Sequence, residues 1–286
     1  MKKLFKLAVN FMAVALMAVC SFGLAGCEDI KKLELSLSLY NYSDNAFYAE
    51  SDVKFSIDLY RHLAPKTVDA VVAHVKAGYY DNAIFYQDAS DSSLIFVGDL
   101  KLENGELKQN LIGGLLPSEI YGEFEAGGTK GSNLVSEKGS IGIWRSYYEQ
   151  DNSYTTSSDA RDSGRATWYL PTATKSAFNG YFCVFAKYDT EDTANAKAIS
   201  TITSIFSNSA HYTEYVIYYT GEYNANKPDE NYGLTFNAVK AEEFDEDTKV
   251  FEAEGKELVC FNKKTVKIPN AINGEISAKI KSVKVK

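Results

Sequence analysis

The sequence has little cysteine, proline, histidine or excess basic charge. Four cysteines in 286 residues are too few for a disulfide scaffold, and five prolines exclude a proline-rich linker protein. Thirty basic against 38 acidic residues give a net charge of -8, which excludes the basic surface that nucleic-acid binders need. His62, His74 and His211 lack metal-ligand spacing, and no C-x-x-C, G-x-S-x-G or Walker motif occurs. We therefore expect no metal, no cofactor and no nucleic-acid partner.

What is present is the composition of a folded, strand-rich protein. Hydrophobic residues make up 45% of the chain and charged residues 24%, a balance that excludes wholesale disorder. Twenty tyrosines and 16 phenylalanines favour β-strands. The length fits one large domain or two modest ones.

The N-terminus has the layout of a secretory leader. A basic start is followed by an apolar run over 7–19 and then by small residues, which predicts a signal peptide at 1–26. The segment L-A-G-C at 24–27 resembles the lipobox of bacterial lipoproteins. This resemblance implies cleavage before Cys27 and a lipid on its sulfur, which would anchor the protein on the extracytoplasmic side of a bacterial cell membrane. A plain signal peptide, a single membrane helix, or Cys20 in place of Cys27 are the alternatives.

Removal of the leader changes the charge and the cysteine count. The leader takes three of the 30 basic residues and none of the 38 acidic ones, so the mature charge becomes -11. Cys183 and Cys260 then remain besides the lipidated Cys27. They lie in apolar contexts, and both a disulfide in an oxidising compartment and two buried free thiols stay open. Residues 27–50 are expected to form a tether that includes one alternating segment at 33–39.

Periodicity then indicates a strand, a helix and a series of short strands. Residues 52–60 alternate apolar and polar side chains, as in a half-buried strand. A helix is expected from Pro65 to Gly78, with four valines on one face, namely Val68, Val71, Val72 and Val75. Short strands are expected at 83–87, 93–100, 121–124, 140–144, 167–170 and 181–188. Many short strands with glycine-marked turns are typical of a barrel or a sandwich.

A second helix and a final strand follow. Isoleucines at every third position predict a helix over 194–206, and the end of the chain predicts a strand within 275–286. Between them, residues 208–275 hold a tyrosine-rich strand at 213–223 and an acidic run. The acidic run lacks the spacing of a calcium loop, so it is read as a solvated face or loop.

The segment 55–99 resembles the cyclophilin-type peptidyl-prolyl isomerases. The motifs A-P-K-T-V at 64–68 and G-Y-Y-D at 78–81 match that family, as does G-E-F at 122–124. Weaker matches follow in the same order at 139–145, 166–170 and 178–187. The resemblance implies a mainly β fold, an eight-stranded closed antiparallel barrel with two capping helices. The domain would span 51–286, with an insertion at about 208–275 before the last strand.

The resemblance also implies a site and shows where this chain departs from it. The family places a catalytic arginine after a Phe-His pair, and Gln87 stands at that arginine position. Trp144 replaces a small alanine, and an indole there can fill the groove. The implied substrate-binding positions are Phe85, Leu94, Phe96, Trp144, Thr167, Tyr169, Phe178 and Phe182. Isomerase activity is therefore expected to be weak or absent.

Three functions remain open. The first is a membrane-anchored prolyl isomerase that acts on proline-containing peptides or unfolded exported proteins. The second is a non-catalytic lipoprotein that binds peptides or proteins. The third is a structural lipoprotein that interacts through its tyrosine-rich insertion. A groove closed by Trp144 or by the insertion would favour the third reading.

Overall fold

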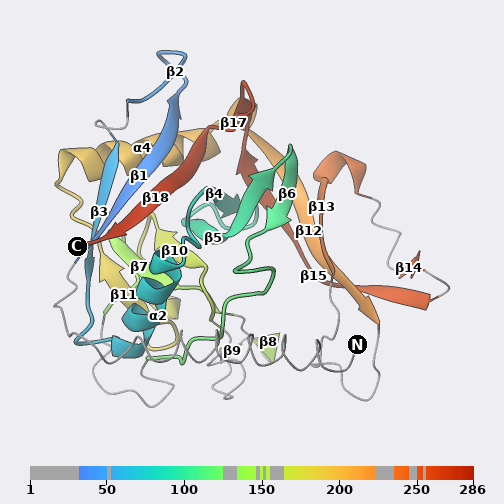
Figure 1. Ribbon diagram of the computed structural model, residues 1–286, viewed down its shortest axis with the longest axis horizontal. Helices are drawn as coiled ribbons and strands as arrows, with labels where there is room; N and C mark the ends of the chain where they lie inside the picture. Colours follow the sequence, from blue (N-terminus) through green and yellow to red (C-terminus); the bar gives the residue numbers. More distant parts are fainter. Residues whose placement is uncertain are drawn as a thin grey trace, which may run out of the picture. The chain divides into compact units, whose positions relative to one another are not determined.

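The structure is a computed structural model that describes residues 32–49, 53–124, 134–145, 149–150, 153–154, 164–222, 235–244, 250–253 and 256–286 (Figure 1). The predicted signal peptide and Cys27 lie outside these ranges. Within the described ranges, no helix combines the length and apolar character needed to cross a membrane.

Eight antiparallel strands pair in a closed ring. Starting from β4, each strand pairs with the next through β18, β1, β3, β11, β7, β10 and β5, and β5 pairs again with β4. Closure removes the free edges that an open sheet would expose. The predicted closed eight-stranded barrel is confirmed. The strands are β1 (Lys32–Asn41), β3 (Lys54–Leu59), β4 (Ala83–Asp88), β5 (Leu94–Glu103), β7 (Ser140–Ile143), β10 (Trp168–Pro171), β11 (Val184–Lys187) and β18 (Ala278–Val285).

The barrel begins earlier than the sequence suggested. β1 pairs with both β18 and β3, so it is a full member of the ring. Its period-two alternation buries one row of side chains in the barrel, namely Leu33, Leu35, Leu37 and Leu39. The barrel therefore includes Lys32–Asn41, which the sequence analysis assigned to the tether expected over 27–50.

Two helices pack against opposite ends of the barrel, as expected (Figure 1). α2 (Pro65–Lys76) follows β3, and Gly78 adopts a positive φ of 71° just after it. α4 (Thr193–Phe206) follows β11, and the Asp192 side chain accepts a hydrogen bond from the Asn195 N–H to cap it.

The strand expected at 121–124 is absent, because this segment crosses the start of α2 instead of joining the ring. The N-cap residue of α2, Ala64, has no side chain that can accept a hydrogen bond. The buried carboxylate of Glu123 accepts from the backbone N–H groups of Lys66 and Thr67, at 3.1 and 2.7 Å. A carboxylate there satisfies free amides and faces the positive end of the helix dipole.

The segment between α4 and β18 adds strands outside the ring, as predicted for the insertion. β12 (Tyr212–Glu222) pairs with β13 (Thr235–Lys240) and with β15 (Lys256–Pro269), which also pairs with β14 (Val250–Ala253) and reaches the ring at β4. β13 comes within 8 Å of β6 (Glu106–Gln109), the hairpin partner of β5. Gln109 Nε2 donates a 2.7 Å hydrogen bond to Tyr219 Oη across this approach. The insertion thus covers the outer face of β4 and β5.

The remaining elements are short. They are the strands β2 (Ala46–Phe47), β8 (Glu149–Gln150), β9 (Ser153–Tyr154), β16 (Ala271–Ile272) and β17 (Glu275–Ile276), and the 3-10 helices η4 (Ser176–Phe178), η5 (Ser209–His211) and η6 (Ala241–Glu243).

Strand register separates two rows of side chains on β4, β5, β10 and β7. One row faces the barrel interior and consists of Phe85, Val97, Trp168 and Ile143. The alternate row faces outward and consists of Tyr86, Phe96, Tyr169 and Gly142. Both rows are buried, the second one beneath other parts of the chain.

Of the two cysteines whose pairing stayed open, Cys183 is a free buried thiol. It lies 3.4 Å from Thr67 Oγ1, and burial raises its pKa to about 12. The thiol is therefore protonated at neutral pH and unreactive. The side chain of Cys260 lies outside the described part of the chain.

His74 makes the stability of the fold depend on pH. It is buried on α2, its Nδ1 has no hydrogen-bond partner among the residues that the structure describes, and burial lowers its pKa from 6.5 to about 4. As the pH falls, the unfolded chain therefore takes up the proton first. We expect the free energy of unfolding to fall between pH 6.5 and 4, by up to roughly 3 kcal/mol from this residue. Urea unfolding of wild type and His74→Gln at pH 7.5 and 4.5 measures it. An equal acid loss in both proteins would contradict this assignment.

Candidate functional site

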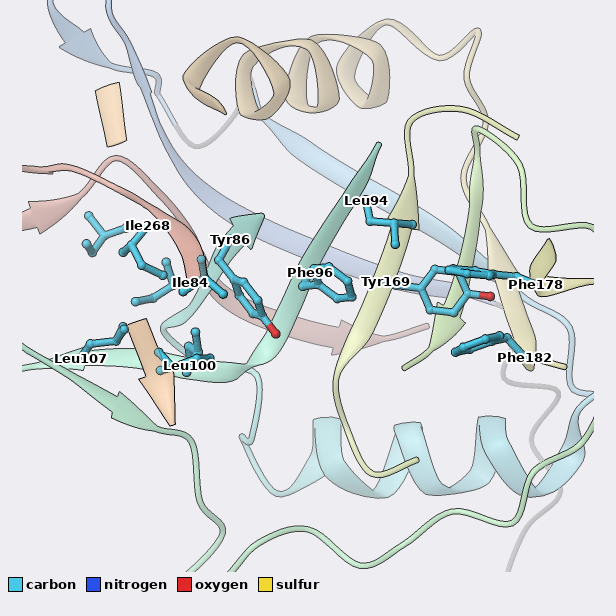
Figure 2. Packing of buried hydrophobic residues seen from close by; sticks show 13 residues of the cluster. Ile84, Tyr86, Leu94, Phe96, Leu100, Leu107, Tyr169, Phe178, Phe182 and Ile268 are labelled. Carbon is cyan, nitrogen blue, oxygen red and sulfur yellow. The ribbon is translucent and has the colours of Figure 1, made fainter. Parts of the chain in front are cut away.

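The outward row of aromatic side chains forms a continuous floor across β4, β5 and β10. Tyr86 stacks on Phe96 with ring centroids 5.3 Å apart, and Phe96 lies directly opposite Tyr169 in the register. Figure 2 shows the row continuing from Tyr169 to Phe178 and Phe182, which stack on each other at 4.4 Å. These residues belong to one buried hydrophobic cluster, and Leu94 also belongs to it.

Tyr169 is held in place from two sides. Its ring lies against Gly142, where an added Cβ would collide with the ring carbons. Its hydroxyl lies 2.8 Å from Ser136 Oγ. Burial raises the pKa of Tyr169 above its usual range, so the phenol is neutral and acts only as a packing and hydrogen-bonding group.

Trp144 covers this floor. Its indole lies 5.0 Å from the ring of Phe96 and 5.3 Å from that of Phe182, measured between centroids. The rings of Phe178 and Tyr169 are 6.0 and 6.2 Å away. Beneath this half-buried indole, Leu94, Phe96 and Phe182 each keep 2% of their surface exposed. A substrate side chain would have to displace the indole to reach them.

Two of the predicted substrate positions are not part of the aromatic floor. Phe85 is directly opposite Val97 in the interior row, with 1% of its surface exposed, so it packs inside the barrel. Thr167 is partly buried, and its backbone carbonyl accepts a 2.8 Å hydrogen bond from the Trp144 N–H. It therefore helps to hold the covering residue. The other six predicted positions are brought together.

Gln87 does not face the aromatic floor. It lies opposite Ile95, on the same side of β4 as Phe85, because side chains alternate along a strand. It keeps 3% of its surface exposed, and its Nε2 donates a 2.9 Å hydrogen bond to the carbonyl of Ser92. Its only strong donor group is thus directed to the adjacent turn.

The insertion places a cation at the other end of the floor. Lys264 Nζ from β15 lies 5.3 Å from the ring centroid of Tyr86 and 5.7 Å from that of Phe96. Tyr86 donates a 3.0 Å hydrogen bond to Asp99 Oδ2. Burial raises the pKa of Asp99, while the charge of Lys264 opposes the rise. Lys264 therefore balances a buried carboxylate.

Sequence reasoning missed Tyr86 and Lys264 at this site. Alternation shows only that Tyr86 and Gln87 lie on opposite faces of β4, and the register with β5 decides that Tyr86 is the one opposite Phe96. Lys264 was not detectable, because no local pattern indicates that a lysine 168 positions further along the chain packs over Phe96.

Comparison with known proteins decides the family. The family described as cyclophilin type peptidyl-prolyl cis-trans isomerase/CLD matches residues 47–217. This chain belongs to the cyclophilin family. No curated protein matches it.

Two solved structures that resemble the chain share little sequence identity with it. Two crystal structures of a cyclophilin type peptidyl-prolyl cis-trans isomerase from Cryptosporidium parvum are among the similar ones. One, determined in the presence of the dipeptide Ala-Pro, is 16% identical, with a TM-score of 0.38, and the match covers 59% of this chain and 85% of that one. The other is 13% identical, with a TM-score of 0.40 and coverage of 81% and 98%.

As a cyclophilin, the chain keeps the barrel but has a filled groove. The outward aromatic side chains are gathered on one face, whereas Gln87, which the sequence analysis predicts at the family's arginine position, is neutral and turned away from them. Charge-assisted hydrogen bonds are roughly twice as strong as neutral ones, so a glutamine there would bind an acceptor more weakly than an arginine.

Proposed function

We propose that this chain is a lipid-anchored, extracytoplasmic cyclophilin-family protein with weak or no isomerase turnover, which binds a partner protein or exported polypeptides outside the aromatic floor that Trp144 covers. The anchor is Cys27, and the client class follows from the secretory leader. The observation that carries the loss of turnover is the indole of Trp144 packed over the buried aromatic floor.

Turnover would need a stabilised twisted amide. The barrier to rotation is about 18–20 kcal/mol, and catalysis must favour the transition state over both planar forms. A preorganised cationic donor aimed at the prolyl nitrogen in a dry pocket does this. Gln87 is neutral and donates to Ser92, and Lys264 lies over Tyr86 and Phe96. Neither side chain therefore combines an accessible apolar surface for a prolyl ring with a hydrogen-bond donor directed at the prolyl nitrogen.

Retained isomerisation is the second candidate, favoured by the six floor positions that remain on one face. If the Trp144 side chain adopts another rotamer, Phe96, Phe178 and Phe182 would form an apolar surface that can bind a prolyl ring. The two candidates differ in what the wild-type protein does to a short X–Pro peptide.

The test is prolyl isomerisation by wild type and Trp144→Ala. We expect wild type to leave the peptide at its uncatalysed rate, because the floor is covered. We expect Trp144→Ala to bind the peptide measurably by titration calorimetry, still without rate acceleration, because Gln87 is uncharged and turned away and Lys264 is held over Tyr86 and Phe96. Acceleration by wild type well above background would establish the isomerase instead.

A further inference from the structure

A short hairpin after β6 exposes a group of leucines to solvent. We call residues 110–117 the leucine hairpin. Leu115 keeps 69% of its surface exposed, Leu116 46% and Leu111 36%. Large apolar side chains exposed singly are ordinary, but a cluster of them marks an interaction site. No charged residue occurs between Lys108 and Glu119.

The leucine hairpin is an ordered structure. Ile112 and Leu115 exchange backbone hydrogen bonds of 2.8 and 3.0 Å. Gly113 and Gly114 between them have φ values of 57° and 83°, the positive values that a two-residue type I′ turn requires. The backbone therefore holds the leucines at a defined tip.

Both ends of the hairpin are fixed to the barrel. Asn110 Nδ2 donates to the carbonyls of Tyr79 and Gly98, at 2.6 and 2.8 Å. At the other end, Arg165 Nη1 donates to the Pro117 carbonyl at 2.7 Å. These contacts are polar and lie at the base, so the exposed leucines at the tip do not contribute to the core.

The place of the hairpin in the fold points to one occupant. It is fastened at Tyr79, just beyond the C-terminal end of α2. β1 begins near the other end of the same helix, because Lys32 pairs with Asp58 at the end of β3, which leads into α2. Five residue steps separate Cys27 from Lys32, and a chain of that length spans at most roughly 17 Å. A lipid on Cys27 therefore holds a bilayer within reach of the end of the barrel at which α2 begins, and α2, with 12 residues, spans only about 18 Å between that end and the hairpin.

We propose that the leucine hairpin inserts into the interfacial region of the bilayer to which Cys27 anchors the protein, and so orients the barrel on the membrane. This rests on the lipid anchor of the proposed function. The mature charge of -11 opposes electrostatic adhesion to anionic headgroups, whereas an uncharged tip with leucine side chains partitions through its apolar surface.

The test places a fluorophore at the tip. The lipidated full-length protein carrying Leu115→Trp is reconstituted in phosphatidylcholine vesicles whose acyl chains are brominated. We expect the emission added by this tryptophan to be largely quenched, with or without phosphatidylglycerol and at low or high salt. Val135→Trp is the matched control, because Val135 is an exposed apolar residue outside the hairpin, and its added emission should stay unquenched.

Three outcomes would overturn the proposal. In the first, the emission of Leu115→Trp stays unquenched in the anchored protein. In the second, quenching requires anionic lipid and disappears at high salt. In the third, sedimentation shows a dimer of the wild type that Leu115→Asn converts to a monomer. The last would assign the hairpin to a second copy of the chain. Labelled palmitate incorporation into wild type but not Cys27→Ser tests the anchor separately, so its failure is distinguishable from that of the hairpin.

Discussion

Replacing Gln87 with arginine is expected to destabilise the protein by about 3–5 kcal/mol and to leave prolyl isomerisation at the uncatalysed rate. The side chain at this position keeps 3% of its surface exposed, so an arginine would carry its charge into a closed site. Lys267 lies directly opposite on β15, and like charges at paired positions repel. The new cation would also be on the face of β4 away from the aromatic floor. Urea unfolding and an X–Pro isomerisation assay measure the two effects.

Gln87→Met is the matched control for this substitution. It keeps the length of the side chain without a charge and loses only the hydrogen bond to Ser92, which costs about 1 kcal/mol. An arginine variant as stable as the methionine variant would show that position 87 reaches solvent. Isomerase activity in that variant would further show that the groove is intact and lacks only its cation.

Truncation of Trp168 to alanine is expected to cost about 3–5 kcal/mol in the free energy of unfolding. This indole keeps 1% of its surface exposed and lies in the interior row of the barrel. Its ring centroid is 4.3 Å from that of Tyr80 and 5.8 Å from that of Phe185. Removal of the indole would leave a cavity among three strands and the segment after α2. The closed barrel is rigid, so its strands cannot move together to fill this cavity. Chemical denaturation monitored by circular dichroism measures the loss.

Trp144→Ala is the matched control for Trp168→Ala, because it makes the same tryptophan-to-alanine change at a half-buried position. Trp144 is half-buried and covers the outer floor, so its loss should cost only about 1–2 kcal/mol. Equal losses for the two variants would mean that the indole of Trp144 is part of the structural core and not a cover over a surface site. A larger loss at Trp144 would reject the assignment of the two rows altogether.

Most elements of the barrel could be predicted from the sequence, because each one is indicated by a pattern of neighbouring residues. The alternation at 52–60 and the valine stripe from Val68 to Val75 led to β3 and α2, and the tyrosine-rich segment led to β12. The strand predicted at 121–124 was wrong, because the Glu123 carboxylate accepts hydrogen bonds at the start of α2, which is distant in the sequence. Likewise, the alternation at 33–39 identified a strand but could not say that the strand joins the ring.

The candidate site was predicted in composition but not in arrangement. Six of the eight substrate positions do meet, because ordered matches to a family fix which strands are neighbours. Gln87 and Phe85 were assigned to the groove from the family pattern, although the parity of β4 turns both away from the row containing Tyr86 and Phe96. Parity relative to a partner strand depends on register, and register is a tertiary property.

The sequence by itself determined the class of the fold, its two helices and the place of the insertion. These follow from periodicity, capping residues and motifs, each of which acts within a few residues. Only the tertiary structure decided that Trp144 covers the floor, that Lys264 lies over Tyr86, and that the leucine hairpin stays exposed. The first two are contacts between residues far apart in the chain, and exposure depends on everything that packs nearby. Burial and proximity of this kind are set by the closure of the barrel, which no local pattern encodes.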